Sequence, residues 1–115
     1  MSRLTLYGIP NCDTVRRARR ELDAAGLAHE FHDLRKQGLE PATLDRWMAA
    51  VGWERLLNRR GTTWRHLPED LRDGLDAPRA RDLMLAEPTL IRRPVIDWDG
   101  AIHVGWDGGV EALLG

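Results

Sequence analysis

The fold is decided by residues 4–22, which read LTLYGIPNCDTVRRARREL. The run Leu4 to Ile9 is typical of a short strand, and the Ile9-Pro10-Asn11 turn ends it. After Cys12 the apolar residues follow helical spacing at Val15, Ala18, Leu22 and Ala25. Gly26 predicts the end of this helix. The only cysteine of the chain is therefore predicted to lie at a strand-to-helix turn.

The middle of the chain is predicted to be mostly helical. A second strand is predicted from His29 to Asp33, followed by a loop from Arg35 to Glu40. Pro41 suits the first turn of a helix that Gly52 ends. Residues 56–63 are predicted to be a loop with a helical turn before it. Two short helices follow, the first on Leu67, Leu71 and Leu75, the second on Ala80, Leu83 and Met84 and closed by Pro88.

The last part of the chain predicts a hairpin and a final helix. Asp99-Gly100 is a strong turn signal between the runs Val95 to Trp98 and Ala101 to Val104. Val110, Leu113 and Leu114 can form one face of a short helix. An early β-α-β unit requires two parallel strands, whereas the hairpin is antiparallel. The predicted fold class is therefore α/β, a thioredoxin-like (glutaredoxin-like) mixed four-stranded sheet with a helical insertion.

Length and composition predict one ordinary domain. The chain has 115 residues, 43% of them hydrophobic and 30% charged, and we expect residues 1–115 to form one domain. A net charge of -1 gives no electrostatic reason to expect nucleic-acid or membrane binding. A lone thiol suits a reducing compartment, and the N-terminus has no signal-peptide profile, so we expect a cytoplasmic protein. We expect a monomer and no metal site.

The position of Cys12 at the start of a helix favours a reactive thiolate. The first N–H groups of a helix have no partner within the helix and carry partial positive charge, which favours a thiolate and can hold an oxyanion. Asn11 and Thr14 are polar neighbours, whereas the Asp13 carboxylate opposes ionisation of the thiol. The structural alternative is an inert, buried cysteine. Val15 stands where a thioredoxin motif has a second cysteine, so an outside thiol must resolve any adduct, with glutathione and then glutaredoxin the natural candidates.

Three blocks of sequence resemble a known family. They are residues 7–14 (YGIPNCDT), 56–64 (LLNRRGTTW) and 83–95 (LMLAEPTLIRRPV). Their order and spacing are similar to the ArsC/Spx (arsenate reductase-related) family, and above all to its YffB-like branch. The resemblance covers nearly the whole chain and implies a thioredoxin-like fold with a helical insertion.

The resemblance also implies a site. In arsenate reductases of this family a cysteine attacks arsenate, arginines hold the oxyanion, and glutathione and glutaredoxin complete the reduction. The cysteine corresponds to Cys12, and Arg93 corresponds to the arginine before a proline, Pro94, that the family places in the cis form. A middle arginine corresponds to Arg60 or Arg59, with Arg60 favoured by the Spx and YffB branches. The third arginine is absent, because residues 102–106 read IHVGW.

These residues lead to one main hypothesis and two alternatives. The main one is a glutathione-dependent thiol oxidoreductase in which Cys12 is the nucleophile, Arg60 and Arg93 bind an oxyanion or a glutathione carboxylate, and Thr14 adds a hydrogen bond. Its substrate is arsenate or a mixed disulfide, with glutathione as co-substrate and no tightly bound cofactor. The first alternative is an Spx-like redox-responsive transcriptional regulator that binds RNA polymerase. The second is an interaction module whose site is vestigial.

Overall fold

A computed structural model describes residues 3–114 of the chain. These residues form two compact units, a sheet unit of residues 3–37 and 93–114 and a helical unit of residues 38–92. The sheet unit contains β1 (Leu4–Gly8), α1 (Asp13–Ala24), β2 (Glu30–Asp33), α2 (Leu34–Gln37), β3 (Val95–Trp98), β4 (Ala101–Val104) and α8 (Gly109–Leu114). The helical unit contains α3 (Pro41–Val51), α4 (Trp53–Leu56), α5 (Thr62–Arg65), α6 (Glu69–Arg72), α7 (Ala77–Ala86) and the 3-10 helix η1 (Pro88–Leu90). Within the described residues, every helix is too short or too polar to cross a bilayer.

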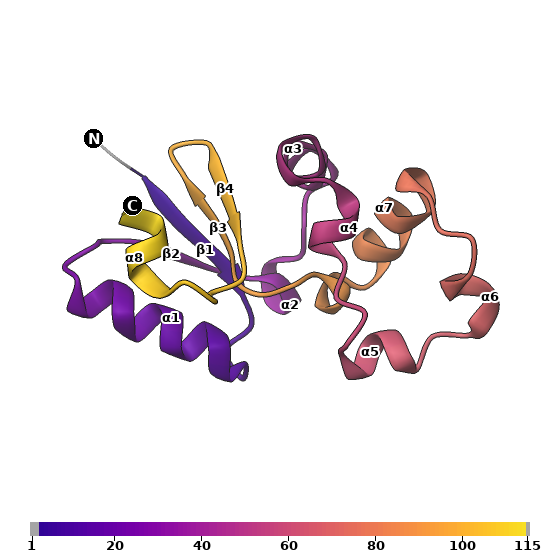
Figure 1. The fold of residues 1–115 in the computed structure, drawn as a ribbon, viewed down its shortest axis with the longest axis horizontal. Helices are drawn as coiled ribbons and strands as arrows, with labels where there is room; N and C mark the ends of the chain where they lie inside the picture. Colours follow the sequence, from indigo (N-terminus) through magenta and orange to yellow (C-terminus); the bar gives the residue numbers. More distant parts are fainter. Residues whose placement is uncertain (1–2, 115) are drawn as a thin grey trace. The chain divides into compact units, whose positions relative to one another are not determined.

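The sheet has the predicted mixed topology, with the strand order β2-β1-β3-β4 (Figure 1). Strands β1 and β2 are parallel, with Gly8 opposite Asp33. Strand β3 is antiparallel to both β1 and β4, with Val95 opposite Tyr7 on one side and Val104 on the other. The fold is therefore α/β and thioredoxin-like, with a helical insertion between β2 and β3.

One face of the sheet packs on α1 and α8. The cluster is built from the buried residues of β1, α1 and β3 together with one indole: Leu4, Leu6, Val15, Ala18, Leu22, Ile96 and Trp106. Helix α1 supplies its stripe because these residues recur at helical spacing, as the sequence predicts. Arg17 donates a hydrogen bond to the carbonyl oxygen of Trp106 at 3.2 Å, which connects α1 to the segment before α8.

The end of α1 follows a Schellman motif. Gly26 has φ +72°, a left-handed conformation that most side chains disfavour. The N–H of Gly26 donates to the carbonyl of Asp23 at 3.0 Å, and that of Leu27 donates to the carbonyl of Leu22 at 2.9 Å. The predicted helix end at Gly26 is confirmed.

The predicted hairpin is confirmed as well. Asp99 and Gly100 both have positive φ, 54° and 90°, which is the backbone twist that a tight two-residue hairpin turn requires. The Asp97 carboxylate accepts a hydrogen bond from the Gly100 N–H at 2.8 Å. The Asp99 carboxylate accepts one from the Arg3 N–H at 2.7 Å, so the turn is also connected to the residue before β1.

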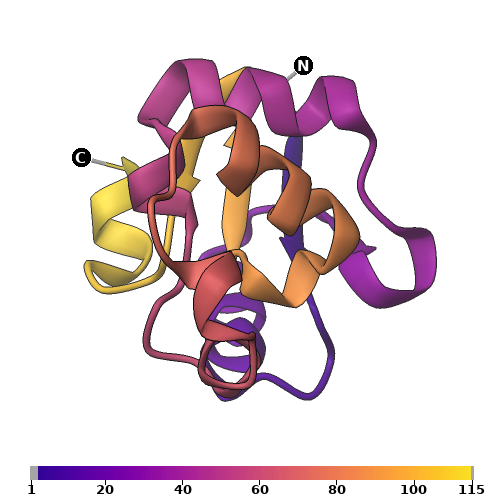
Figure 2. The ribbon, with the colours of Figure 1, turned by 90° about the vertical axis from the view of Figure 1, so that its right-hand side faces the viewer.

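Helices α3 and α7 pack against each other within the helical unit, and an ion pair connects them. Figure 2 shows the ribbon of this unit facing the viewer. Arg81 of α7 donates two hydrogen bonds to the Asp45 carboxylate of α3, at 2.6 and 3.2 Å. The hydrogen bond from Arg81 lowers the pKa of Asp45. Asp76 caps α7 by accepting from the Arg79 N–H at 3.0 Å.

Some short helical turns were not predicted. Residues 34–37 form α2 rather than loop, because the Asp33 carboxylate accepts from the N–H groups of Arg35 and Lys36 at 2.9 and 3.2 Å. The helix predicted around Leu67, Leu71 and Leu75 is reduced to α6, residues 69–72. Helix α5 and the 3-10 helix η1 were also missed, and a contact of 3.2 Å between the hydroxyls of Thr63 and Thr89 connects them.

Candidate functional site

Cys12 is the residue that precedes α1, as predicted. Its backbone is extended (φ -106°, ψ 123°), and its carbonyl accepts the first helical hydrogen bond, from the Arg16 N–H, at 2.9 Å. The thiol is half-buried, packs against the edge of the hydrophobic cluster and caps no backbone N–H. The N–H groups of the first turn of α1 therefore remain available to an anion beside the sulfur.

Val15, one helical turn further on, has no accessible surface. It occupies the position of a second cysteine in a thioredoxin motif, and Cys12 is the only cysteine in the sequence. A disulfide formed on Cys12 must therefore involve another molecule.

The carboxylate of Asp13 interacts with an arginine rather than with the Cys12 thiol. Its side chain is 93% exposed and forms an ion pair and hydrogen bond with Arg16. Arg16 also donates to the carbonyl oxygen of Pro10 at 3.2 Å, so its guanidinium joins the turn before Cys12 to the first turn of α1. The pairing reduces the negative field of Asp13 at the neighbouring sulfur, although solvent screens a pair this exposed. The sequence predicted the charge of Asp13 but not its partner.

Asn11 and Thr14 lie on either side of the cysteine turn, and both are exposed. In the described part of the chain neither side chain has a hydrogen-bond partner, so both can donate to a ligand bound beside Cys12. Their proximity to the sulfur follows from the sequence alone, because each is within two residues of it.

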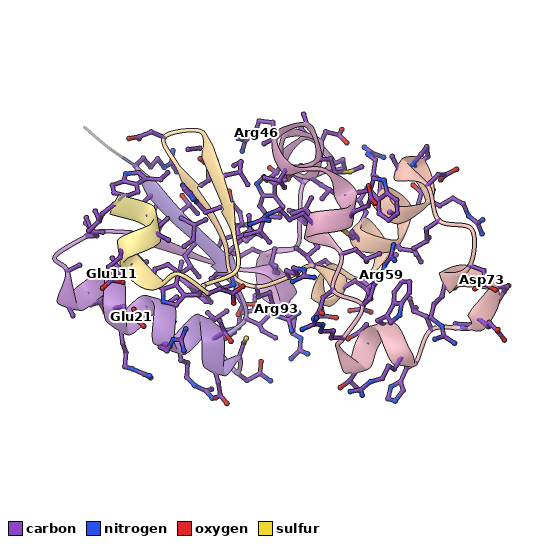
Figure 3. The ribbon with its side chains drawn as sticks, in the orientation of Figure 1. Glu21, Arg46, Arg59, Asp73, Arg93 and Glu111 are labelled. Carbon is purple, nitrogen blue, oxygen red and sulfur yellow. The ribbon has the colours of Figure 1, made fainter. Side chains whose placement is uncertain are left out.

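Arg93 and Pro94 belong to the same end of the sheet as the cysteine turn. Val95 pairs with Tyr7, so the two residues before β3 lie next to the end of β1, from which the chain continues to Cys12. The Arg93-Pro94 peptide bond is cis, as the resemblance implied. Pro94 is buried, and its carbonyl accepts from the Gly105 N–H at 2.8 Å, whereas Arg93, which Figure 3 labels, is half-buried.

Arg59 and Arg60 lie in the helical unit, on the turn between α4 and α5. The guanidinium carbon of Arg59 lies 5.7 Å from the ring centre of Trp53 and 5.8 Å from that of Trp64. The N–H of Arg60 donates to the side-chain oxygen of Asn58 at 3.0 Å. The contact with Trp53 was not foreseen, because no sequence spacing pairs residues 53 and 59.

The mixed sheet, the cysteine before its first helix and the cis proline before β3 define a thioredoxin-fold, arsenate-reductase-related protein. The chain belongs to the ArsC family, whose model matches residues 7–110. It is similar to the solved structure of a YFFB protein, with 42% identity, a TM-score of 0.88 and 96% of each chain covered.

Two further relatives show how far the family extends. The solution structure of an arsenate reductase (ArsC) related protein from Brucella melitensis is 51% identical, with a TM-score of 0.78, and the match covers 92% of this chain and 88% of that one. The global transcriptional regulator Spx of Listeria innocua is 28% identical over 109 residues, which is 90% of this chain and 80% of that protein. The predicted resemblance to the ArsC/Spx family and its YffB-like branch is confirmed.

Proposed function

We propose that the protein is a glutathione-dependent thiol oxidoreductase in which Cys12 is the nucleophile. The observation that carries the proposal is the place of Cys12, half-exposed at the N-terminal end of the 12-residue helix α1. Unpaired N–H groups at a helix start favour a thiolate over a thiol, and the thiolate is the reactive species. Membership of an arsenate-reductase-related family supports the same chemistry.

The other site residues have binding roles in this proposal. Arg93 offers a planar guanidinium for an oxyanion or a glutathione carboxylate at the end of the sheet that carries the cysteine turn. Asn11 and Thr14 add hydrogen bonds, and Pro94 fixes the backbone after Arg93. The resemblance assigns a second binding arginine to Arg60, or to Arg59, and this stays a prediction.

The reaction on a mixed disulfide takes two thiol–disulfide exchanges. The Cys12 thiolate attacks the glutathione sulfur of a disulfide R–S–S–G, forms a Cys12–glutathione disulfide and releases R–S⁻. A second glutathione thiolate then attacks the glutathione sulfur of that adduct, which gives glutathione disulfide and restores the Cys12 thiolate. In sum, one glutathione thiol is oxidised, R–S–S–G is reduced to R–SH, and the glutathione unit of the substrate leaves as one half of glutathione disulfide. No tightly bound cofactor is required, and glutaredoxin can replace glutathione in the second step.

Arsenate is the other candidate substrate. Arsenic acid and two thiols, Cys12 and glutathione, give arsenous acid, one water and a Cys12–glutathione disulfide, which a further glutathione reduces as above. Residues 102–106 read IHVGW and lack the third arginine of arsenate reductases. A disulfide substrate makes less demand on that position, because it carries no compact oxyanion at the reacting atom.

The test is turnover with a defined donor. Wild-type protein and Cys12→Ser are supplied with excess glutathione and either arsenate or the mixed disulfide of glutathione and 2-mercaptoethanol. Glutathione disulfide is measured by NADPH consumption with glutathione reductase. We expect turnover by the wild type on at least one substrate and none above background by Cys12→Ser. Wild-type rates equal to background with both substrates, with and without added glutaredoxin, would refute the proposal.

An Spx-like regulator is the second candidate, favoured by the 28% identity to a global transcriptional regulator over 90% of this chain. Such a protein would bind RNA polymerase, as the resemblance to Spx implies. The buried Val15 weighs against a switch based on paired cysteines in this chain. A pull-down with purified RNA polymerase distinguishes the two functions, because the enzyme proposal expects no retention of polymerase subunits.

A further inference from the structure

The turn from Asn58 to Gly61 is built around one amide side chain. The Asn58 N–H donates to the carbonyl of Leu90 at 2.7 Å, which fixes the start of the turn to the 3-10 helix η1. The side-chain oxygen of Asn58 then accepts from the Arg60 N–H at 3.0 Å. Gly61 closes against the same side chain, and a Cβ there would lie 3.0 Å from Asn58 Nδ2. A side chain at residue 61 would therefore press on the amide that closes the turn.

Arg59 connects the two helices on either side of this turn. Trp53 is the first residue of α4 and Trp64 belongs to α5, and the guanidinium of Arg59 lies within 6 Å of both indole centres, at 5.7 and 5.8 Å. A cation in such a position is attracted to the electron-rich face of each ring. Figure 3 shows Arg59 on the turn between α4 and α5.

The side chain of Arg60, the next residue, makes no polar or ring contact with the described residues. It is exposed, and its guanidinium has no hydrogen bond, ion pair or ring contact with any of residues 3–114. Both arginines are exposed, but they differ in their contacts: the guanidinium of Arg59 lies near two indole rings, whereas Arg60 is connected to the turn only through its backbone N–H.

We propose that Arg59 is a positioning residue, which holds the Asn58–Gly61 turn between Trp53 and Trp64 so that Arg60 presents its guanidinium to a compact oxyanion or a carboxylate. The anion-binding half of this inference rests on the proposed function. It also assigns separate roles to the two arginines between which the resemblance expresses only a preference, with Arg60 binding the anion and Arg59 holding the turn.

The first test measures the turn itself and needs no activity. Amide hydrogen exchange at Arg60 reports its hydrogen bond to Asn58, and we compare wild type with Arg59→Gln, Arg59→Lys and the matched control Arg55→Gln, an exposed arginine of α4. We expect exchange at Arg60 to rise about threefold in Arg59→Gln and to stay near the wild-type rate in the other two. An ammonium also binds to indole faces, so Arg59→Lys should keep the turn closed.

The second test separates positioning from binding by steady-state kinetics with arsenate and with the mixed disulfide of glutathione and 2-mercaptoethanol. We expect Arg60→Gln to raise KM about tenfold and Arg59→Gln to raise it about threefold, with kcat little changed by the latter. A Trp53→Leu, Trp64→Leu double variant should reproduce Arg59→Gln, because it removes both rings and leaves both arginines in place.

The outcomes distinguish this inference from the proposed function. Unchanged exchange at Arg60 in Arg59→Gln overturns the positioning role, whatever the kinetics show. Faster exchange with an unaltered KM, in a protein whose Arg60→Gln variant binds weakly, overturns it too. Faster exchange in a protein without any turnover supports the holding role of Arg59 and counts against the proposed enzyme alone.

Discussion

Gly8 and Val15 touch so closely that a Cβ on Gly8 would lie 2.7 Å from Cγ2 of Val15. Gly8 ends β1 and Val15 lies in the first turn of α1, so this contact sets how near the start of the helix comes to the sheet. Cys12 lies between the two residues in sequence. The absence of a side chain at residue 8 therefore helps to place the sulfur.

Replacing Gly8 by alanine should destabilise the protein by about 1–3 kcal/mol, because the added methyl overpacks a filled site. The free energy of unfolding from urea denaturation measures the loss. In the double variant with Val15→Ala the cost of the added methyl should fall, since the valine methyls that it meets are gone. Equal costs of Gly8→Ala in the two backgrounds would show that the contact does not constrain the turn.

Arg16→Ala should slow the alkylation of Cys12 by iodoacetamide. The variant leaves the Asp13 carboxylate, which is the next residue after Cys12, without its ion-pair partner, and a nearby negative charge disfavours the thiolate. The measurement is the rate of modification at neutral pH and low salt, with Arg20→Ala as the control on the same helix. Because both side chains are exposed, the difference should shrink in molar salt. A difference that persists there would point to a change of structure rather than of charge.

The Asp45–Arg81 pair should contribute to stability at neutral pH and not in acid. The hydrogen bond from Arg81 lowers the pKa of Asp45 below its ordinary value, so the folded state favours the charged carboxylate. The contribution is present above that value and is lost as the pH falls through the lowered pKa. Asp45→Asn should therefore lower Tm at neutral pH and have little effect at a pH below the lowered pKa of Asp45. A Tm difference independent of pH would contradict this assignment.

Gly26→Ala should cost about 1 kcal/mol of unfolding free energy, because φ is +72° at this residue and an alanine there is strained. A Cβ at residue 26 would meet no atom within 4 Å, so the cost comes from the backbone and not from a clash. Gly26→Asn is the matched control, because asparagine tolerates the left-handed conformation better. Equal losses in the two variants, measured by urea denaturation, would argue against a conformational cause.

Local patterns account for what could be predicted of the fold. The Asp99-Gly100 turn and the Schellman end of α1 at Gly26 depend on a few consecutive residues, so their signals are complete in the sequence. Helix α2 was missed although its cap by Asp33 is a local signal, whereas α5 was missed because it is anchored to η1 through Thr63 and Thr89. Contacts between residues far apart in sequence leave no periodic signal.

The site divides in the same way. The position of Cys12 at the start of a helix could be predicted, since it requires only a strand, a turn and a helix in succession. The pairing of Asp13 with Arg16 could also have been predicted, because residues three apart are neighbours on a helix. The difference between Arg59 and Arg60 was not, since it depends on two indoles that the tertiary fold brings to the former.

The sheet unit is interrupted in sequence by the helical unit, which occupies residues 38–92. Strand β3 pairs with β1, so a ribosome must synthesise the whole insertion before the central pairing of the sheet can form. Until then the sheet can contain only β1 and β2, and the Arg93-Pro94 segment is not yet placed beside the end of β1 that leads to Cys12. The surroundings of Cys12 in the sheet unit are therefore completed only after the helical unit has been synthesised.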